Sequence, residues 1–150
     1  MKRDELLERV REGHETLLRA LEGLDEERAT RKGLNPQWSV KDALSHIAAW
    51  EIEGARIIDE IQKGTWQPQR MSKEMIDEFN ARAVADRRER SMSEVRAEFD
   101  DAHARMQQLL ETLPEEVDEA SPAYKFAAEV TFKHHASHAA QIEEWKSKLQ

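Results

Sequence analysis

The start of the chain alternates apolar and charged residues in steps that fit one face of a helix. The less polar positions recur at every third or fourth residue: Leu7, Val10, His14, Leu17, Leu21 and Leu24. This spacing is typical of a helix packed in a bundle. The pattern predicts a helix over residues 4–24, followed by an irregular segment over residues 25–37 with Gly33 and Asn35-Pro36 as helix breakers.

A second helix is predicted over residues 38–63. Ser39 and Asp42 have the spacing of a capping box, and Gly64 follows the last predicted turn. Its inward face is expected to carry Val40, Ala43, Ile47, Trp50, Gly54, Ile57 and Ile61.

Two further long helices and one short helix are predicted in the rest of the chain. Ser91 and Glu94 form a second capping box, which opens a helix that ends before Pro114. Ser121-Pro122 combines an N-cap residue with proline at the first helical position, which predicts a helix over residues 122–148. A short helix over residues 72–88 is predicted inside the long connection between the second and third helices.

These elements predict an all-α fold, a single four-helix bundle domain over residues 1–150 with a short extra helix between helices two and three. The connection that carries the extra helix is long enough for helices two and three to run parallel. The predicted core includes Leu17, Leu21, Ile47, Ile58, Phe99, Met106, Val130 and Ile142.

Composition narrows the chemistry that the bundle can carry. The chain has no cysteine, so a metal must be held by histidine and carboxylate ligands, which suit Zn, Ni, Fe or Mn. The net charge of −8 argues against binding to a nucleic-acid backbone. The basic run Arg82, Arg87, Arg88 and Arg90 is interpreted as a solvated helix face, with a docking site for an acidic ligand as the alternative.

Hydropathy indicates neither a membrane span nor an export signal. No apolar stretch reaches the roughly 20 residues of a transmembrane helix. The N-terminal sequence MKRDELLERV lacks the apolar core of a signal peptide. We therefore expect a cytoplasmic protein with no membrane partner.

Histidines supply the candidate chemistry. His134 and His138 are four residues apart, so a helix places both imidazoles on one face, where they can share a divalent metal. The pair could also arise by chance, and it gains meaning only from a third ligand. His46, near the start of the second helix, offers that ligand, because bundles build metal sites from facing helices. Three imidazoles with one open position are typical of a catalytic metal site.

The chain also resembles a known family in two stretches, WSVKDALSHIAAWE (residues 38–51) and TFKHHASHAAQIEEW (residues 131–145). It resembles the DinB-like superfamily of metal-binding four-helix bundles, and within it the ClbS/DfsB family. The resemblance implies helices in up-down-down-up order and a metal-binding triad that falls on His46, His134 and His138. It also implies, together with the long amphipathic helices, a homodimer.

Three further residues near the predicted site are open to more than one interpretation. The family often has a tyrosine at the position of His135, which is either an exposed replacement or a competing ligand three residues before His138; we favour the first. Gln141 shares the face of His138 and either orients water or substrate or packs at the bundle seam. Glu51, one turn beyond His46, is either a solvated acid, an acceptor for an imidazole N–H, or a general base.

Two functions follow as hypotheses. The resemblance implies a metal-dependent protective enzyme that activates water or a small thiol against a reactive small molecule, with Glu51 and Gln141 as candidate catalytic residues. The alternative is a non-catalytic, stress-related bundle that binds a ligand or forms a dimer and keeps a vestigial metal site. The sequence alone does not name the substrate.

Overall fold

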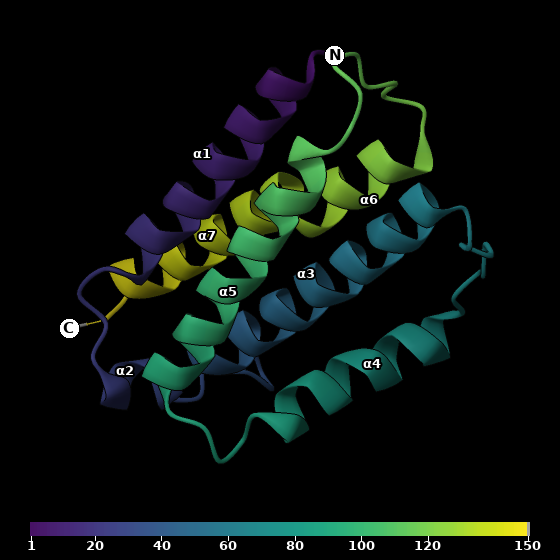
Figure 1. Ribbon diagram of the computed structural model, residues 1–150. Coiled ribbons are helices and arrows are strands. Elements are labelled where there is room, and N and C mark those ends of the chain that lie inside the picture. Colours follow the sequence, from purple (N-terminus) through teal and green to yellow (C-terminus); the bar gives the residue numbers. More distant parts are fainter. Residues whose placement is uncertain (150) are drawn as a thin grey trace.

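The computed structural model describes residues 1–149, whose main secondary-structure elements are helices joined by turns and irregular segments (Figure 1). In chain order these are α1 (Arg3–Leu21), α2 (Glu26–Thr30), α3 (Val40–Lys63), α4 (Lys73–Asp86), α5 (Met92–Glu111), α6 (Pro122–Val130) and α7 (Phe132–Ser147). The predicted all-α class is confirmed. Both predicted capping boxes form, at the starts of α3 and α5.

Hydrogen bonds at both ends of α3 and α5 show that these two helices run parallel. At their starts, Lys41 Nζ donates to the carbonyl oxygen of Arg90 at 2.7 Å. At their ends, Gln62 Nε2 donates to Thr112 Oγ1 at 2.9 Å. The long connection through α4 makes this arrangement possible, because α4 returns along α3 before α5 begins (Figure 1).

The first and last helices of the bundle run in the opposite direction. Arg3 Nη1 donates to the carbonyl oxygen of Leu113 at 2.9 Å, which places the start of α1 beside the end of α5. Lys146 Nζ donates to the carbonyl oxygen of Ala20 at 2.9 Å, which places the ends of α1 and α7 together. The bundle elements therefore follow the expected up-down-down-up order, with α6 and α7 as the fourth element (Figure 1).

The predicted helix over residues 122–148 is interrupted at Thr131, where the backbone adopts φ −115° and ψ −105°. Thr131 Oγ1 donates to the carbonyl oxygen of Ala127 at 2.6 Å, a contact that bends helices because it competes with the backbone ladder. The residues on either side of the break pack against glycines of other helices. A Cβ atom at Gly13 of α1 would lie 2.7 Å from Phe132 Cα, and one at Gly54 of α3 would lie 2.6 Å from Val130 Cγ2.

Two corrections concern the first connection. The first helix ends at Leu21, earlier than predicted, and Gly23 adopts a left-handed φ of 80°. The segment expected to be irregular contains the short helix α2, which is capped by Asp25: its side chain accepts a hydrogen bond from the backbone N–H of Arg28 at 2.9 Å.

All eight predicted core residues are buried. The inward face of α3, however, differs from the prediction beyond its first two turns. Ile47, Glu51, Gly54 and Ile58 are buried there, whereas Trp50, Ile57 and Ile61 are only partly buried. A glutamate thus occupies a core position, and Trp50 and Ile57 face a cavity described below.

The basic run is not uniformly solvated. Arg87 is buried; its guanidinium pairs with Glu98 and donates to the carbonyl oxygen of Ala83 at 2.9 Å. The other three arginines of the run are exposed.

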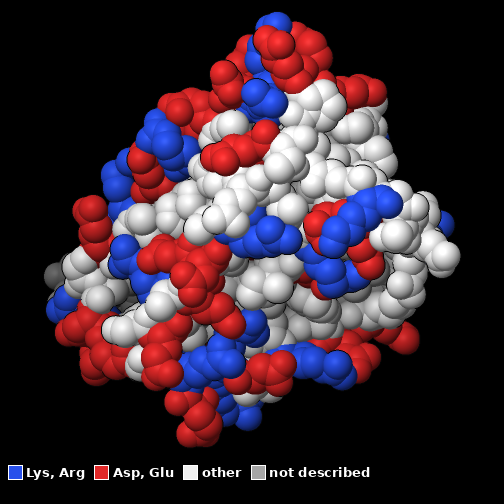
Figure 2. Space-filling view, viewed as in Figure 1, with Lys and Arg blue, Asp and Glu red and all other residues white. Residues whose placement is uncertain are grey.

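Acidic and basic side chains are interspersed over the face of the molecule shown in Figure 2. Across residues 1–149, none of the helices has an apolar stretch that could cross a bilayer.

Candidate metal site and adjoining cavity

Three imidazoles from two helices converge at one point. His46 Nε2 of α3 lies 2.9 Å from His134 Nε2 of α7, and His138 Nε2 lies 3.1 Å from the same atom. Among the described residues these three are the only group of His, Asp or Glu side chains whose ligand atoms all lie within 4.8 Å of one another. The structure thus brings together the three residues that the sequence singles out, here termed the histidine triad.

The outer nitrogen of His46 is held by α4. Asn80 Oδ1 lies 2.7 Å from Trp50 Nε1 and 2.9 Å from His46 Nδ1. An indole N–H can only donate, so the Asn80 atom that it faces must be the amide oxygen. His46 Nδ1 must then donate to that oxygen, which leaves the lone pair of His46 on Nε2, the atom that faces the other two imidazoles.

Gln141 contacts the triad from the outside. Its Oε1 accepts from His138 Nδ1 at 3.2 Å, which places the His138 lone pair on Nε2 as well. The amide therefore orients an imidazole; the structure puts it on the side of His138 that is turned away from His134. This contact is of the kind that fixes the tautomer of metal-binding histidines.

Burial keeps the triad neutral at pH 7. Burial, together with the neighbouring imidazoles, lowers the pKa of His46 to about 4 and that of His134 to about 2. Burial likewise lowers the pKa of His138, against a hydrogen bond to Gln141 that raises it. Neutral imidazoles are the form that binds metal ions.

The arrangement of the three imidazoles is explained better with a divalent metal ion between them than without one. Two lone pairs, on His46 and His138, point at the Nε2 atom of His134, which carries at most one hydrogen to share with them. His134 Nδ1 is buried and has no hydrogen-bond partner in the structure. A cation would accept the lone pairs of all three Nε2 atoms, and three histidines with an open position form a common catalytic ligand set.

The prediction that His135 is exposed is wrong. Its side chain is fully buried, with Nε2 2.8 Å from Oε1 of Glu51, which is also fully buried. Burial raises the pKa of Glu51 to about 8 and lowers that of His135 to about 3, so both groups are neutral at pH 7. Glu51 is therefore no solvated acid, and neither residue belongs to the group that converges at the triad.

Sequence reasoning missed Asn80 altogether. Asn80 lies on α4, four residues after Ile76 and three before Ala83, so the three residues share one face of the helix. On that face Asn80 is an uncharged polar residue between two apolar ones. That interruption of the apolar pattern is the signal that could have marked it. The sequence of α4 alone does not show that Asn80 contacts α3.

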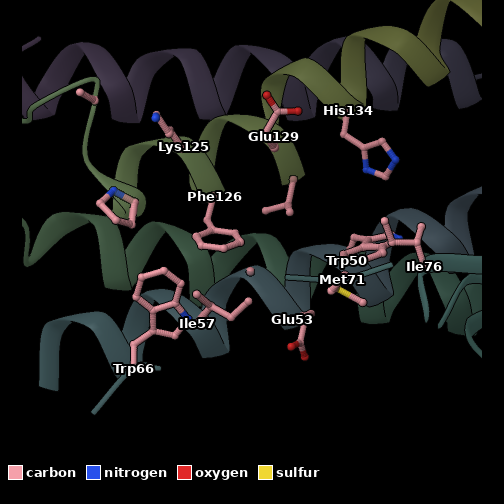
Figure 3. Close-up of a pocket in the computed structure, with 14 residues that line it drawn as sticks. Trp50, Glu53, Ile57, Trp66, Met71, Ile76, Lys125, Phe126, Glu129 and His134 are labelled. Carbon is pink, nitrogen blue, oxygen red and sulfur yellow. The ribbon is translucent and has the colours of Figure 1, made fainter. Parts of the chain in front are cut away.

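A cavity of about 620 Å³ adjoins the triad (Figure 3). His134 projects into it at one end, beside Trp50, Met71 and Ile76, and Trp66, Ile57 and Phe126 lie toward the other end (Figure 3). The volume is in the range of sites for small organic molecules. His134 is the residue common to the triad and to the cavity wall.

The chain matches the DinB superfamily over residues 3–142, which is nearly its whole length. The chain belongs to the DinB superfamily. None of the curated proteins matches it in sequence at a significant level.

Solved structures of the same fold support the assignment. The structure of DfsB, described as a sibling lethal factor precursor, has a TM-score of 0.84 at 14% identity, with 98% of this chain and 96% of that chain covered. The colibactin self-resistance protein ClbS, in complex with double-stranded DNA, has a TM-score of 0.84 at 12% identity, with coverage of 99% and 98%. A mycothiol-dependent maleylpyruvate isomerase has a TM-score of 0.74 at 19% identity, with coverage of 95% and 61%. At these identities the likeness concerns the fold.

Proposed function

We propose that this DinB superfamily protein is a metal-dependent enzyme that acts on a reactive small molecule bound in the cavity beside the histidine triad. The proposal rests on the position of His134. This residue is one of the three convergent imidazoles and is also part of the cavity wall. A molecule in the cavity would have its end next to the triad.

His46, His134 and His138 would hold the ion, with Zn, Ni, Fe or Mn as the candidates. When bound there, such an ion would polarise an electrophile or lower the pKa of a water or thiol. Asn80 and Gln141 keep two of the imidazoles in the tautomer that directs Nε2 inward. Trp50 lines the cavity beside His134 and, through its indole N–H, fixes Asn80.

A protective role is supported by the neighbouring structures. ClbS is a colibactin self-resistance protein, and the isomerase of the same fold depends on mycothiol. Self-resistance and dependence on an external thiol are both consistent with the proposed reaction, in which water or a small thiol is the attacking group. The absence of cysteine from this chain fits a nucleophile that comes from outside.

The test is turnover of a panel of epoxides, activated esters and Michael acceptors by the purified protein. We expect consumption of at least one class that stops with a chelator, returns with metal, and is lost in His46→Ala. His103→Gln is the control, because it changes a histidine outside the triad. Turnover that is indifferent to chelator and to His46→Ala would contradict the proposal.

The second candidate is a non-catalytic ligand-binding protein with a vestigial metal site. One observation favours it: Glu51, a candidate catalytic residue, is fully buried and its side chain is hydrogen-bonded to His135. Tight binding of cavity ligands by a protein that turns over no electrophile, with or without metal and thiol, would support this candidate.

Assembly and partners remain proposals. We infer that residues 1–150 act as one domain in a homodimer; within residues 1–149, Ile52, Met75 and Ile76 of α3 and α4 are the large apolar side chains that remain exposed. Sedimentation equilibrium giving the mass of one 17.4 kDa chain at micromolar concentration would count against the dimer.

The ClbS structure contains double-stranded DNA, so the expectation from net charge that this chain binds no nucleic acid stays a prediction.

A further inference from the structure

The interior of the cavity offers a ligand almost nothing but carbon surface. Its wall is built mainly from Trp50, Ile57, Trp66, Met71, Phe126 and Val130. Trp66 and Phe126 meet edge to face at the end away from the triad, with ring centroids 5.7 Å apart. Such an aromatic end favours a ligand with an apolar or aromatic body.

The polar atom of Trp50 is not available to a ligand. Its indole N–H is already used in the 2.7 Å hydrogen bond to Asn80 Oδ1, and its ring packs against Phe79 with centroids 4.2 Å apart. Trp50 therefore presents ring carbons to the cavity, beside the imidazole of His134.

The carboxylates in the lining have partners of their own. Glu53 binds Arg56 through both carboxylate oxygens, with Arg56 Nε 3.1 Å from Glu53 Oε2. Glu129 pairs with Lys133 at 3.2 Å on the exposed side of α6. Lys125, the remaining charged residue of the lining, is exposed to solvent. Charge is thus confined to the solvated rim, and the interior stays apolar.

We infer that the cavity selects substrates with an uncharged apolar body, such as two fused aromatic rings or a medium-length acyl chain, whose reactive polar group lies at His134. This inference rests on the proposed function, because it names the substrate class of that same site. A sugar-like or peptide-like body would lose its hydrogen bonds to water and find no replacement in the interior. The polar part of the substrate must therefore lie at the triad or at the rim.

Binding is tested without turnover, with 2-naphthylmethanol as the apolar probe and methyl glucoside as the polar one. Quenching of tryptophan fluorescence reports occupancy, because Trp50 and Trp66 line the cavity. We expect the naphthyl alcohol to bind at least about a hundredfold more tightly than the glucoside, since only the former can replace its water contacts by apolar burial. Comparable affinity of the two probes would overturn the inference.

Two substitutions on α3 form a matched pair. Ile57→Gln places an amide in the cavity wall, whereas Ile52→Gln places one on the exposed surface, outside that wall. We expect the first to weaken binding of the naphthyl alcohol by about tenfold or more and the second by less than about twofold. Equal effects would contradict the inference. Should Ile57→Gln fail to fold, Trp66→Ser in the connection before α4 makes the same test.

The same assay separates this inference from the proposed function. His46→Ala should lose metal-dependent turnover and still bind the naphthyl alcohol within about threefold of the wild type, because His46 is not part of the cavity wall. Normal probe selectivity in a protein without metal or turnover would refute the proposed function alone. Turnover of polar electrophiles together with loss of selectivity would refute the substrate class alone.

Discussion

Two groups of histidines lie side by side in this bundle, and only one is arranged to bind a metal. In the histidine triad the three Nε2 atoms point at one another, and two of the outer nitrogens have amide acceptors. The other group, here termed the buried histidine cluster, consists of the buried residues His14, His135 and Glu51 and the partly buried His103. In this cluster the rings of His14 and His103 are stacked, with their centroids 3.7 Å apart and an angle of 13° between the ring planes.

The difference lies in where the lone pairs point. Imidazole lone pairs lie in the plane of the ring, so two stacked rings cannot direct them at a common ion. The buried histidine cluster also leaves four buried polar atoms without a partner: Nδ1 of His14, His103 and His135, and Oε2 of Glu51. Burial lowers the pKa of His14 to about 3, so this ring, like that of His135, is neutral at pH 7. The presence of several histidines is therefore not enough to make a metal site.

The two groups meet at adjacent residues of α7. His134 belongs to the triad and lines the cavity, whereas His135 is buried against Glu51. Successive residues of a helix point about 100° apart, so neighbours in sequence face different surroundings. One helix thereby separates a candidate metal site from a structural contact.

The largest expected effect concerns the contact between Glu51 and His135. Glu51→Leu or His135→Phe alone leaves one buried polar group unpaired, and each should lower the free energy of unfolding by about 1–3 kcal/mol. The double variant removes both polar groups, so we expect it to recover to within about 1 kcal/mol of the wild type or to exceed it. Urea unfolding of the four proteins measures this cycle.

The same four proteins should bind metal alike, because neither residue belongs to the triad. A double variant that is stable but binds no metal would contradict the distinction between the two groups. Strictly additive losses in the cycle would show that the two side chains do not act as a pair.

The next effect concerns Asn80, which fixes the tautomer of His46. Asn80→Leu removes the acceptor for both His46 Nδ1 and Trp50 Nε1, so metal affinity should fall by about 10- to 100-fold. Asn80→Asp keeps an acceptor oxygen and should retain affinity close to that of the wild type. Competition with a chromophoric chelator measures the metal affinity of both variants. If Asn80→Asp bound metal as weakly as Asn80→Leu, Asn80 would not act by fixing the tautomer of His46.

Gln141 should matter less than Asn80. Its hydrogen bond to His138 is longer, at 3.2 Å, and the side chain is only partly buried, so water can replace it. We expect Gln141→Ala to weaken metal binding by less than about tenfold. A loss larger than that of Asn80→Leu, in the same chelator competition, would reverse this ranking of the two amides.

The smallest expected effect is that of mild acid on metal binding. Unperturbed imidazoles would lose affinity below a pH of about 6.5. Burial lowers the pKa of His46 to about 4 and that of His134 to about 2, and it also lowers the pKa of His138. The three rings therefore stay neutral as the pH falls through 6.5, and protonation competes with the metal only at lower pH. Affinity should change by less than about twofold between pH 7 and pH 6. A tenfold loss over that unit would show that the triad titrates as exposed histidines do.

Most of the features that the sequence predicted correctly are local. Capping residues and apolar spacing determine the helix starts at Ser39 and Ser91, and the four-residue step from His134 to His138 follows from helix geometry alone. The up-down-down-up order followed from the family resemblance and from the length of one connection.

The features it did not predict depend on contacts between helices. A glutamate such as Glu51 is expected at the surface because burial of a charged carboxylate is unfavourable, and only the partner on α7 and neutralisation make its burial possible. The break at Thr131 depends on the space that Gly13 and Gly54 leave on two other helices. Asn80 gains its role only when α4 lies against α3.

The most direct test of the central claim is the metal content of protein purified without a histidine tag, compared among wild type, His46→Ala and His135→Phe. We expect about one divalent ion per chain in the wild type and in folded His135→Phe, and less than about a tenth of that in His46→Ala. Circular dichroism confirms that each variant keeps its helices. Equal metal content in wild type and His46→Ala, or loss of metal from folded His135→Phe with retention in His46→Ala, would contradict the assignment of the site to the triad.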